Sequence, residues 1–212
     1  MRRVAKHPGN VRTDSGIELL AEYGLDEVPH PNLLVVPGAE SATDLRDEPE
    51  ILAWIRTVHT VTTWTTSVCT GSLILGAAGI LSGLPATTHW AAHDRLSFYG
   101  AKPTRTRVVE ASKVITAAGV SAGIDMALVL AAKVAGQLIS RSLQLAIEYD
   151  PAPPFDSGSP GKAPDALVSR ISGRLRANFR YPTNRFGQRT LALTTGTIQT
   201  AYPSGSRMLA II

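Results

Sequence analysis

The stretch Trp64-Thr65-Thr66-Ser67-Val68-Cys69-Thr70-Gly71-Ser72 places the only cysteine of the chain at a change of local sequence pattern. Residues 62–68 are dense in Thr, Val and Trp, which favour a pleated strand, whereas residues 71–81 predict a short helix. A sharp turn from strand to helix lifts its central side chain out of the sheet and directs backbone N–H groups toward it. We therefore interpret Cys69 as a candidate nucleophile, with a thiol pKa lowered from about 8.5 by the start of the helix. The alternative is a buried cysteine that serves only as a small hydrophobe.

The overall composition is that of a globular protein with one main domain. The chain has 212 residues, and 44% of them are hydrophobic, which is enough to fill a core. No apolar run approaches the roughly 20 residues that span a bilayer, and the basic start is not followed by a signal-peptide core, so we expect a cytoplasmic protein. A single cysteine excludes an internal disulfide and a Cys-rich zinc site, and it fits a reducing compartment.

The net charge of +4 comes from the end of the chain. Residues 166–212 contain no Asp or Glu and seven arginines, so subtracting these seven charges from +4 leaves −3 for residues 1–165. We expect residues 1–165 to form an α/β domain, residues 166–178 an Arg-rich helix, and the rest a disordered tail. Nucleic-acid binding is not expected, because the tail lacks interleaved aromatic residues and any known binding motif.

The segments around Cys69 predict a parallel sheet. Leu33-Leu34-Val35-Val36 is a continuous apolar run stopped by Pro37-Gly38, which is typical of a strand buried on both faces. Residues 48–60 have apolar positions at helical spacing, with Asp47 as the expected cap and Pro49 just inside. This helix leads into the strand that ends at Val68, and a strand–helix–strand unit normally gives parallel strands.

Further elements follow the cysteine. Residues 87–90 should form a short strand or loop that brings His89 near the site, although a structural histidine is an equal alternative. Residues 108–109 and 114–116 predict two strands around a polar turn. Residues 121–136 predict a buried helix with its apolar stripe on Ile124, Leu128, Ala131 and Val134, and residues 137–147 predict a second helix.

Several separated motifs occur in an order that resembles the ThiJ/PfpI superfamily, which has the class I glutamine amidotransferase-like fold. They are residues 67–79 (SVCTGSLILGAAG), 86–90 (ATTHW), 118–125 (AGVSAGID) and 148–160 (EYDPAPPFDSGSP). The last two are similar to the isonitrile hydratase branch in particular. The resemblance implies a flavodoxin-like three-layer α/β sandwich with a mostly parallel sheet, a homodimer, and neither a metal nor an organic cofactor.

The same resemblance implies a reaction and a set of site residues. Isonitrile hydratases add water to a small-molecule isocyanide and give an N-substituted formamide. Cys69 takes the position of the nucleophile, and Thr70 that of the residue whose hydroxyl and N–H face the reacting group. Gly38 and Ala39 stand where the superfamily supplies a second backbone donor, so an oxyanion-binding pair from the Ala39 and Thr70 amides is expected. His89 matches the site-proximal histidine.

Both ends of the chain depart from the family pattern. An initial strand and a loop with an acidic residue beside the nucleophile are missing, and no residue here takes the role of that carboxyl. We expect the missing strand to leave a sheet edge exposed. A late start codon or a deletion would explain the beginning, and a frameshift near Phe179 would explain the acid-free end.

Three alternatives to a hydratase remain open from the sequence. The first is an inactive, truncated remnant, and the second is another Cys-dependent hydrolase or glyoxalase of the same fold. The third is a sensor domain like those of AraC-type transcription regulators, although residues 166–212 are too short for their helix-turn-helix repeats.

Overall fold

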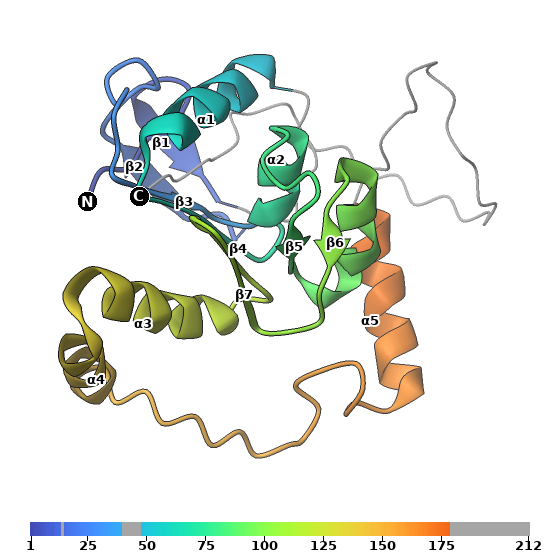
Figure 1. Ribbon diagram of the computed structural model, residues 1–212. Helices are drawn as coiled ribbons and strands as arrows, with labels where there is room; N and C mark the ends of the chain where they lie inside the picture. Colours follow the sequence, from blue (N-terminus) through green and yellow to red (C-terminus); the bar gives the residue numbers. More distant parts are fainter. Residues whose placement is uncertain (14, 40–47, 179–212) are drawn as a thin grey trace.

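The computed structural model describes residues 1–13, 15–39 and 48–178 (Figure 1). Its strands are β1 (Gly9–Arg12), β2 (Glu18–Ala21), β3 (Leu33–Val36), β4 (Trp64–Val68), β5 (Pro85–Ala86), β6 (Lys102–Pro103), β7 (Val108–Ala111) and β8 (Val114–Ala117). Its helices are α1 (Pro49–Val61), α2 (Gly71–Ala77), the 3-10 helix η3 (Trp90–Tyr99), α3 (Ala122–Ala135), α4 (Gln137–Ala146) and α5 (Asp165–Asn178).

The central sheet has the strand order β3-β4-β8-β7. β3 pairs with β4 in parallel, with Leu33 opposite Trp64, and β4 pairs with β8 in parallel, with Thr65 opposite Val114. β7 joins antiparallel to β8 through a tight turn in which Ser112 has a positive φ of 56°. The mostly parallel sheet expected from the sequence is therefore confirmed, and a β1–β2 hairpin and a β5–β6 pair lie outside it.

Helices cover both faces of this sheet and make the expected three layers. α1 and α2 lie on one face and α3 on the other (Figure 1). The four apolar residues of β3 serve both layers, because side chains alternate along a strand. Leu34 and Val36 belong to the core beneath α1 and α2, whereas Leu33 and Val35 pack against the core beneath α3. This double burial explains why β3 is apolar at every position.

The helix predictions are confirmed in place but not in every detail. α2 ends at Ala77 rather than at residue 81, and Gly79 continues the chain in a left-handed turn with φ of 81°. The predicted cap Asp47 lies outside the described residues, and α1 begins after Glu48 without a side-chain cap. The segment around His89 is a loop that leads directly into η3.

The predicted apolar stripe of α3 is wrong. The buried residues are Ala122, Met126 and Leu130, whereas Ile124 is 39% exposed and Val134 is 65% exposed. The reason is the close approach of the helix to β4, where an added Cβ at Gly123 would lie 3.1 Å from Val68 Cγ1. That contact fixes the rotation of the helix, and so positions with four-residue spacing face the sheet.

The edge of the sheet and the last described helix bear on two expectations from the sequence. β3 is the outer strand of the sheet, since the described residues provide no further strand beside it. α5 matches the predicted Arg-rich helix and lies against η3, and the predicted tail after it falls outside the described residues. None of the helices in the described ranges is both long and apolar enough to cross a bilayer.

Candidate active site

Cys69 occupies a strained turn between β4 and α2. Its φ is 57°, a left-handed conformation that costs a non-glycine residue roughly 1–2 kcal/mol. Its backbone amide donates to the carbonyls of Ala117 (3.1 Å) and Ala118 (2.9 Å). Its carbonyl accepts from Ser72 Oγ (3.1 Å) and Thr88 Oγ1 (2.9 Å). Both polar groups of its backbone are thus occupied, which fixes the backbone of the turn that carries the thiol.

Two glycines bring the end of β3 against this turn. A Cβ at Gly38 would lie 2.7 Å from Cys69 Cβ and 2.8 Å from the Thr70 nitrogen. A Cβ at Gly71 would lie 2.2 Å from the carbonyl oxygen of Val36. No side chain fits at either position without a backbone shift. The carboxyl ends of β3 and β4 therefore meet at the cysteine, as expected for a site at the edge of a parallel sheet.

Thr70 and Ala39 are joined by two hydrogen bonds through one hydroxyl. Thr70 Oγ1 donates to the Ala39 carbonyl (2.7 Å) and accepts from the Ala39 amide (3.0 Å). The Ala39 N–H is therefore engaged, so the predicted pair of free Ala39 and Thr70 amides is not arranged in this structure. The Thr70 amide instead lies next to the thiol, where its hydrogen bond favours the ionised form.

The pKa of the Cys69 thiol is raised above its ordinary value, and this corrects the prediction of a lowered one. Burial of the thiol in the turn is the larger effect, and the hydrogen bond from the Thr70 amide only partly opposes it. The helix that follows has seven residues, and its start is packed beneath Gly38 and Val36. At neutral pH Cys69 therefore keeps its proton.

His89 packs against Gly119, in the segment after β8 that also contacts Cys69. Its Nδ1 accepts from the Ala91 amide (3.3 Å) and so caps η3. A Cβ at Gly119 would lie 3.2 Å from the imidazole Cδ2, and Gly119 directly follows the two residues that accept the Cys69 amide. Burial lowers the pKa of His89, so its neutral ring carries the proton on Nε2.

The structure therefore brings Gly38, Ala39, Cys69 and Thr70 into contact and places His89 behind Gly119. Sequence reasoning missed Thr88 and Ser72, which hold the Cys69 carbonyl. The hydroxyl of Ser72, three residues after the cysteine, was a usable signal. In the described ranges no carboxylate hydrogen-bonds to Cys69 or Thr70, and no group of three His, Cys, Asp or Glu side chains is arranged to hold a metal.

Comparisons with known proteins agree with the overall fold. The pattern of the DJ-1/PfpI family matches residues 1–133. An isonitrile hydratase of Pseudomonas putida is 42% identical over 173 residues, which are 82% of this chain and 76% of that protein. The crystal structure of a ThiJ/PfpI family protein from Pseudomonas syringae superposes with a TM-score of 0.76 at 36% identity, covering 84% of this chain and 77% of that one.

A relative of another class matches a shorter region. The HTH-type transcriptional regulator CdhR of Pseudomonas aeruginosa is 31% identical over 133 residues, which are 60% of this chain but only 38% of that protein. The family match, the sequence relatives and the three-layer architecture all point to one assignment. The chain belongs to the DJ-1/PfpI family.

Proposed function

We propose that the chain is an isonitrile hydratase, which adds water to an isocyanide through Cys69. The observation that carries the proposal is the left-handed cysteine turn in a chain that is 42% identical to the Pseudomonas putida isonitrile hydratase. The turn aims a thiol at the carboxyl edge of the parallel sheet. A thiol suits an isocyanide because it supplies both the proton and the nucleophile that the terminal carbon accepts in an addition.

The proposed reaction needs only water and the thiol proton. Sulfur donates an electron pair to the terminal carbon of R–N≡C, and that carbon takes the proton that leaves the thiol, which gives the thioimidate R–N=CH–S–Cys69. Water then adds across the C=N bond, with hydroxyl on carbon and hydrogen on nitrogen. Loss of the C–S bond releases R–NH–CHO, and the hydroxyl proton returns to sulfur. A thiol that stays protonated at neutral pH suits this sequence, because it brings its own proton.

The neighbouring residues have proposed roles in the same steps. The Thr70 amide stabilises negative charge on sulfur as the C–S bond forms and breaks. Gly38 leaves room for the thiol, and Ala39 fixes the Thr70 hydroxyl. His89 is proposed as the group that relays a proton between water and the isocyanide nitrogen. No cofactor enters these steps, and a reducing cytoplasmic compartment would keep the lone thiol active.

Formamide production from a simple alkyl isocyanide tests the proposal. The purified chain is incubated with the isocyanide beside the Cys69→Ser and Cys69→Ala variants, and product is followed by mass spectrometry. We expect formamide from the wild type only, together with a transient mass increase of one isocyanide on the wild-type protein. A folded wild type that makes no formamide, or a Cys69→Ala variant that makes as much, contradicts a hydratase that uses Cys69.

A sensor domain is the second candidate, supported by the 31% identity to the regulator CdhR over 133 residues. In that function the same site binds a small molecule without turning it over. Titration of the Cys69→Ala variant with an alkyl isocyanide separates the two candidates when combined with the product assay. Binding without turnover by the wild type favours the sensor, whereas turnover favours the enzyme.

We also propose that the chain forms a homodimer through α4 and the segment after it. Ser140 is the buried residue of α4, whereas Leu138 and Leu145 on the same helix are 77% and 82% exposed. A short helix with so little burial is marginal in water unless its apolar side chains are covered. Light scattering after gel filtration measures the mass, and Leu138→Glu combined with Leu145→Glu should shift a dimer to monomer.

A further inference from the structure

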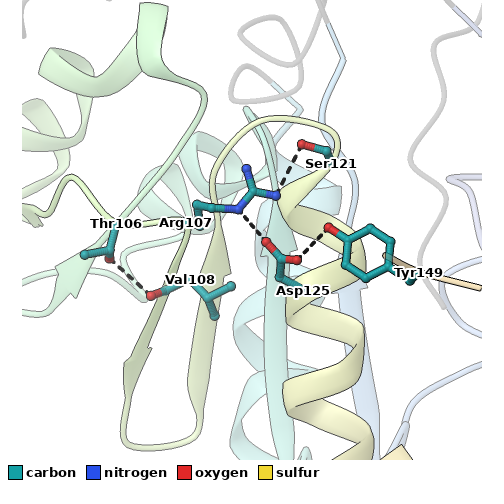
Figure 2. A network of polar contacts seen from close by, with 6 residues as sticks. All are labelled: Thr106, Arg107, Val108, Ser121, Asp125 and Tyr149. Atoms are coloured by element: carbon teal, nitrogen blue, oxygen red, sulfur yellow. Dashed lines mark hydrogen bonds and ion pairs between the residues drawn. The ribbon is translucent and has the colours of Figure 1, made fainter. Parts of the chain in front are cut away.

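A polar network joins three segments of the chain at the start of α3 (Figure 2). Arg107, which directly precedes β7, donates from Nε to Asp125 Oδ2 (2.5 Å) and from Nη2 to Ser121 Oγ (3.3 Å). Tyr149, in the segment that follows α4, donates its hydroxyl to Asp125 Oδ1 (2.7 Å). Both carboxylate oxygens of Asp125 are thus bound, each by a donor from a different segment.

The same arginine also holds the turn that leads into α3. This site-facing turn consists of residues 118–121. The Arg107 carbonyl accepts from the Ala118 amide (2.8 Å) at the start of the turn, while its guanidinium binds Ser121 at the end. Arg107 therefore binds both ends of the turn, through its carbonyl at Ala118 and through its guanidinium at Ser121.

The inner side of the site-facing turn touches the reacting groups. The Ala118 carbonyl accepts the Cys69 amide (2.9 Å), and Gly119 lies against the imidazole of His89, with only 3.2 Å between an added Cβ and Cδ2. A displacement of this turn would loosen the backbone of the nucleophile and the packing of His89 together.

We propose that Arg107, Asp125 and Tyr149 are positioning residues, which hold the site-facing turn against Cys69 and His89 and thereby set the reactivity of the thiol. The part that concerns catalysis rests on the proposed hydratase function. The part that concerns the thiol does not, because thiol reactivity is measurable with a general alkylating reagent.

The exposure of the network favours this local role over a role in overall stability. The side chains of Arg107 and Asp125 are 55% and 29% exposed, and ion pairs with such access to water add little to global folding. Removing the network should therefore leave the protein folded. Its geometry, with three segments converging on one carboxylate, restricts where the turn can lie.

A second ion pair supplies a matched control. Lys133 Nζ and Glu110 Oε2 are 2.6 Å apart and join β7 to the last turn of α3, at the end of the helix opposite to Asp125. Their side chains are 31% and 45% exposed, similar to the pair in the network. Glu110→Gln thus breaks an equivalent bridge that does not reach the site-facing turn.

The experiment compares wild type, Asp125→Asn, Tyr149→Phe and Glu110→Gln. The rate of Cys69 alkylation by iodoacetamide is measured against pH, and kcat and KM for an alkyl isocyanide are measured on the same samples. Melting curves by circular dichroism identify any variant that is unfolded at the assay temperature. Tyr149→Phe removes one hydrogen bond and keeps the ring, so it remains informative if Asp125→Asn does not fold.

We expect the two network variants to react faster with iodoacetamide but to hydrate the isocyanide more slowly. Water that enters beside a displaced turn lowers the pKa of the buried thiol toward its ordinary value, and half a unit raises the thiolate fraction at pH 7 about threefold. At the same time kcat falls because the groups around sulfur are less well placed, whereas KM changes little. Glu110→Gln should match the wild type in both assays.

Two results would overturn the inference. The first is that folded Asp125→Asn and Tyr149→Phe alkylate Cys69 with the same pH profile as the wild type. The second is that Glu110→Gln changes this profile as much as the two network variants do. A wild type without formamide production but with the expected alkylation profiles refutes the hydratase proposal alone. The two proposals therefore fail on different measurements.

Discussion

The Thr70 hydroxyl lies between the carbonyl and the amide of Ala39 and binds both, at 2.7 Å and 3.0 Å. Thr70 is 2% exposed and Ala39 is half-buried, so water has limited access to these two bonds. One side chain therefore fixes the loop after β3 to the residue that follows the nucleophile. Substitutions at Thr70 can therefore remove or keep this hydroxyl while the rest of the site stays the same.

Thr70→Val removes the hydroxyl and keeps the shape of the side chain. Two backbone groups of Ala39 lose their partner, and we expect the free energy of unfolding to fall by about 1–3 kcal/mol, with a larger relative loss of formamide production. Thr70→Ser retains the hydroxyl and should remain close to the wild type in both respects. Urea unfolding and the product assay check this, and a Val variant equal to the Ser variant contradicts it.

Gly38→Ala places a methyl group where the turn has no space. With Cβ 2.7 Å from Cys69 Cβ, the backbone must move, so we expect loss of formamide production and a destabilisation of about 1–3 kcal/mol. Gly158→Ala is the control, because nothing lies within 4 Å of an added Cβ there. Full activity of Gly38→Ala in a folded protein would show that the turn tolerates the shift.

The alkylation of Cys69 should have its midpoint above the ordinary thiol pKa of about 8.5, because burial raises the pKa in the folded protein. The same shift affects stability. A group with a raised folded pKa favours the folded state below its unfolded pKa, and this advantage is lost as pH rises through the folded value. Mass spectrometry of iodoacetamide labelling between pH 6 and 10 measures the midpoint, and one below pH 8 contradicts the expected direction.

His89→Asn separates a structural role from a chemical one. Asparagine is a good cap and can accept from the Ala91 amide, so the melting temperature should stay close to that of the wild type. The Nε2 proton is lost, and if His89 relays a proton, kcat should fall by about 100-fold or more. An Asn variant with the wild-type rate would make His89 a cap of η3 only.

Lys113→Met tests a contact that closes the end of α1. The ammonium donates to the carbonyls of His59, Thr60 (3.4 Å) and Thr62 (3.1 Å), at the end of the helix where carbonyls lack a helical amide donor. We expect the free energy of unfolding to fall by about 1–2 kcal/mol, while the exposed Lys102→Met should be neutral. Urea unfolding compares the two, and an unchanged midpoint for Lys113→Met would show that water replaces the ammonium.

Local patterns predicted the elements that meet at the site. Leu33-Leu34-Val35-Val36 is apolar throughout because both faces of β3 are covered, and the change from β-forming to small residues at Cys69 marks the real turn. The positions of α1, α4 and α5 also follow from their periodicity. These features depend on neighbours within a few residues, which the sequence displays directly.

Features that depend on distant neighbours were not predictable in the same way. The rotation of α3 is set by Gly123 against Val68, and the thiol pKa by the burial of Cys69 rather than by the start of α2. The hydrogen bond between the Ala39 amide and the Thr70 hydroxyl joins the segment after β3 to the segment after β4. A helical stripe or a turn motif does not encode which remote group will fill the space beside it.

The strand order β3-β4-β8-β7 also limits the route by which the chain folds. β7 and β8 are neighbours in sequence and close through a short turn, so this hairpin can form early and locally. The two parallel pairs close larger loops, because Leu33 pairs with Trp64 across 31 residues and Thr65 pairs with Val114 across 49. The nucleophile turn contacts Gly38 after β3 and the carbonyls of Ala117 and Ala118 at the end of β8, so we expect it to be complete only when both parallel pairs have formed. Because β3 is the outer strand of the described sheet and β8 an inner one, amide hydrogens of β3 should exchange with solvent before those of β8.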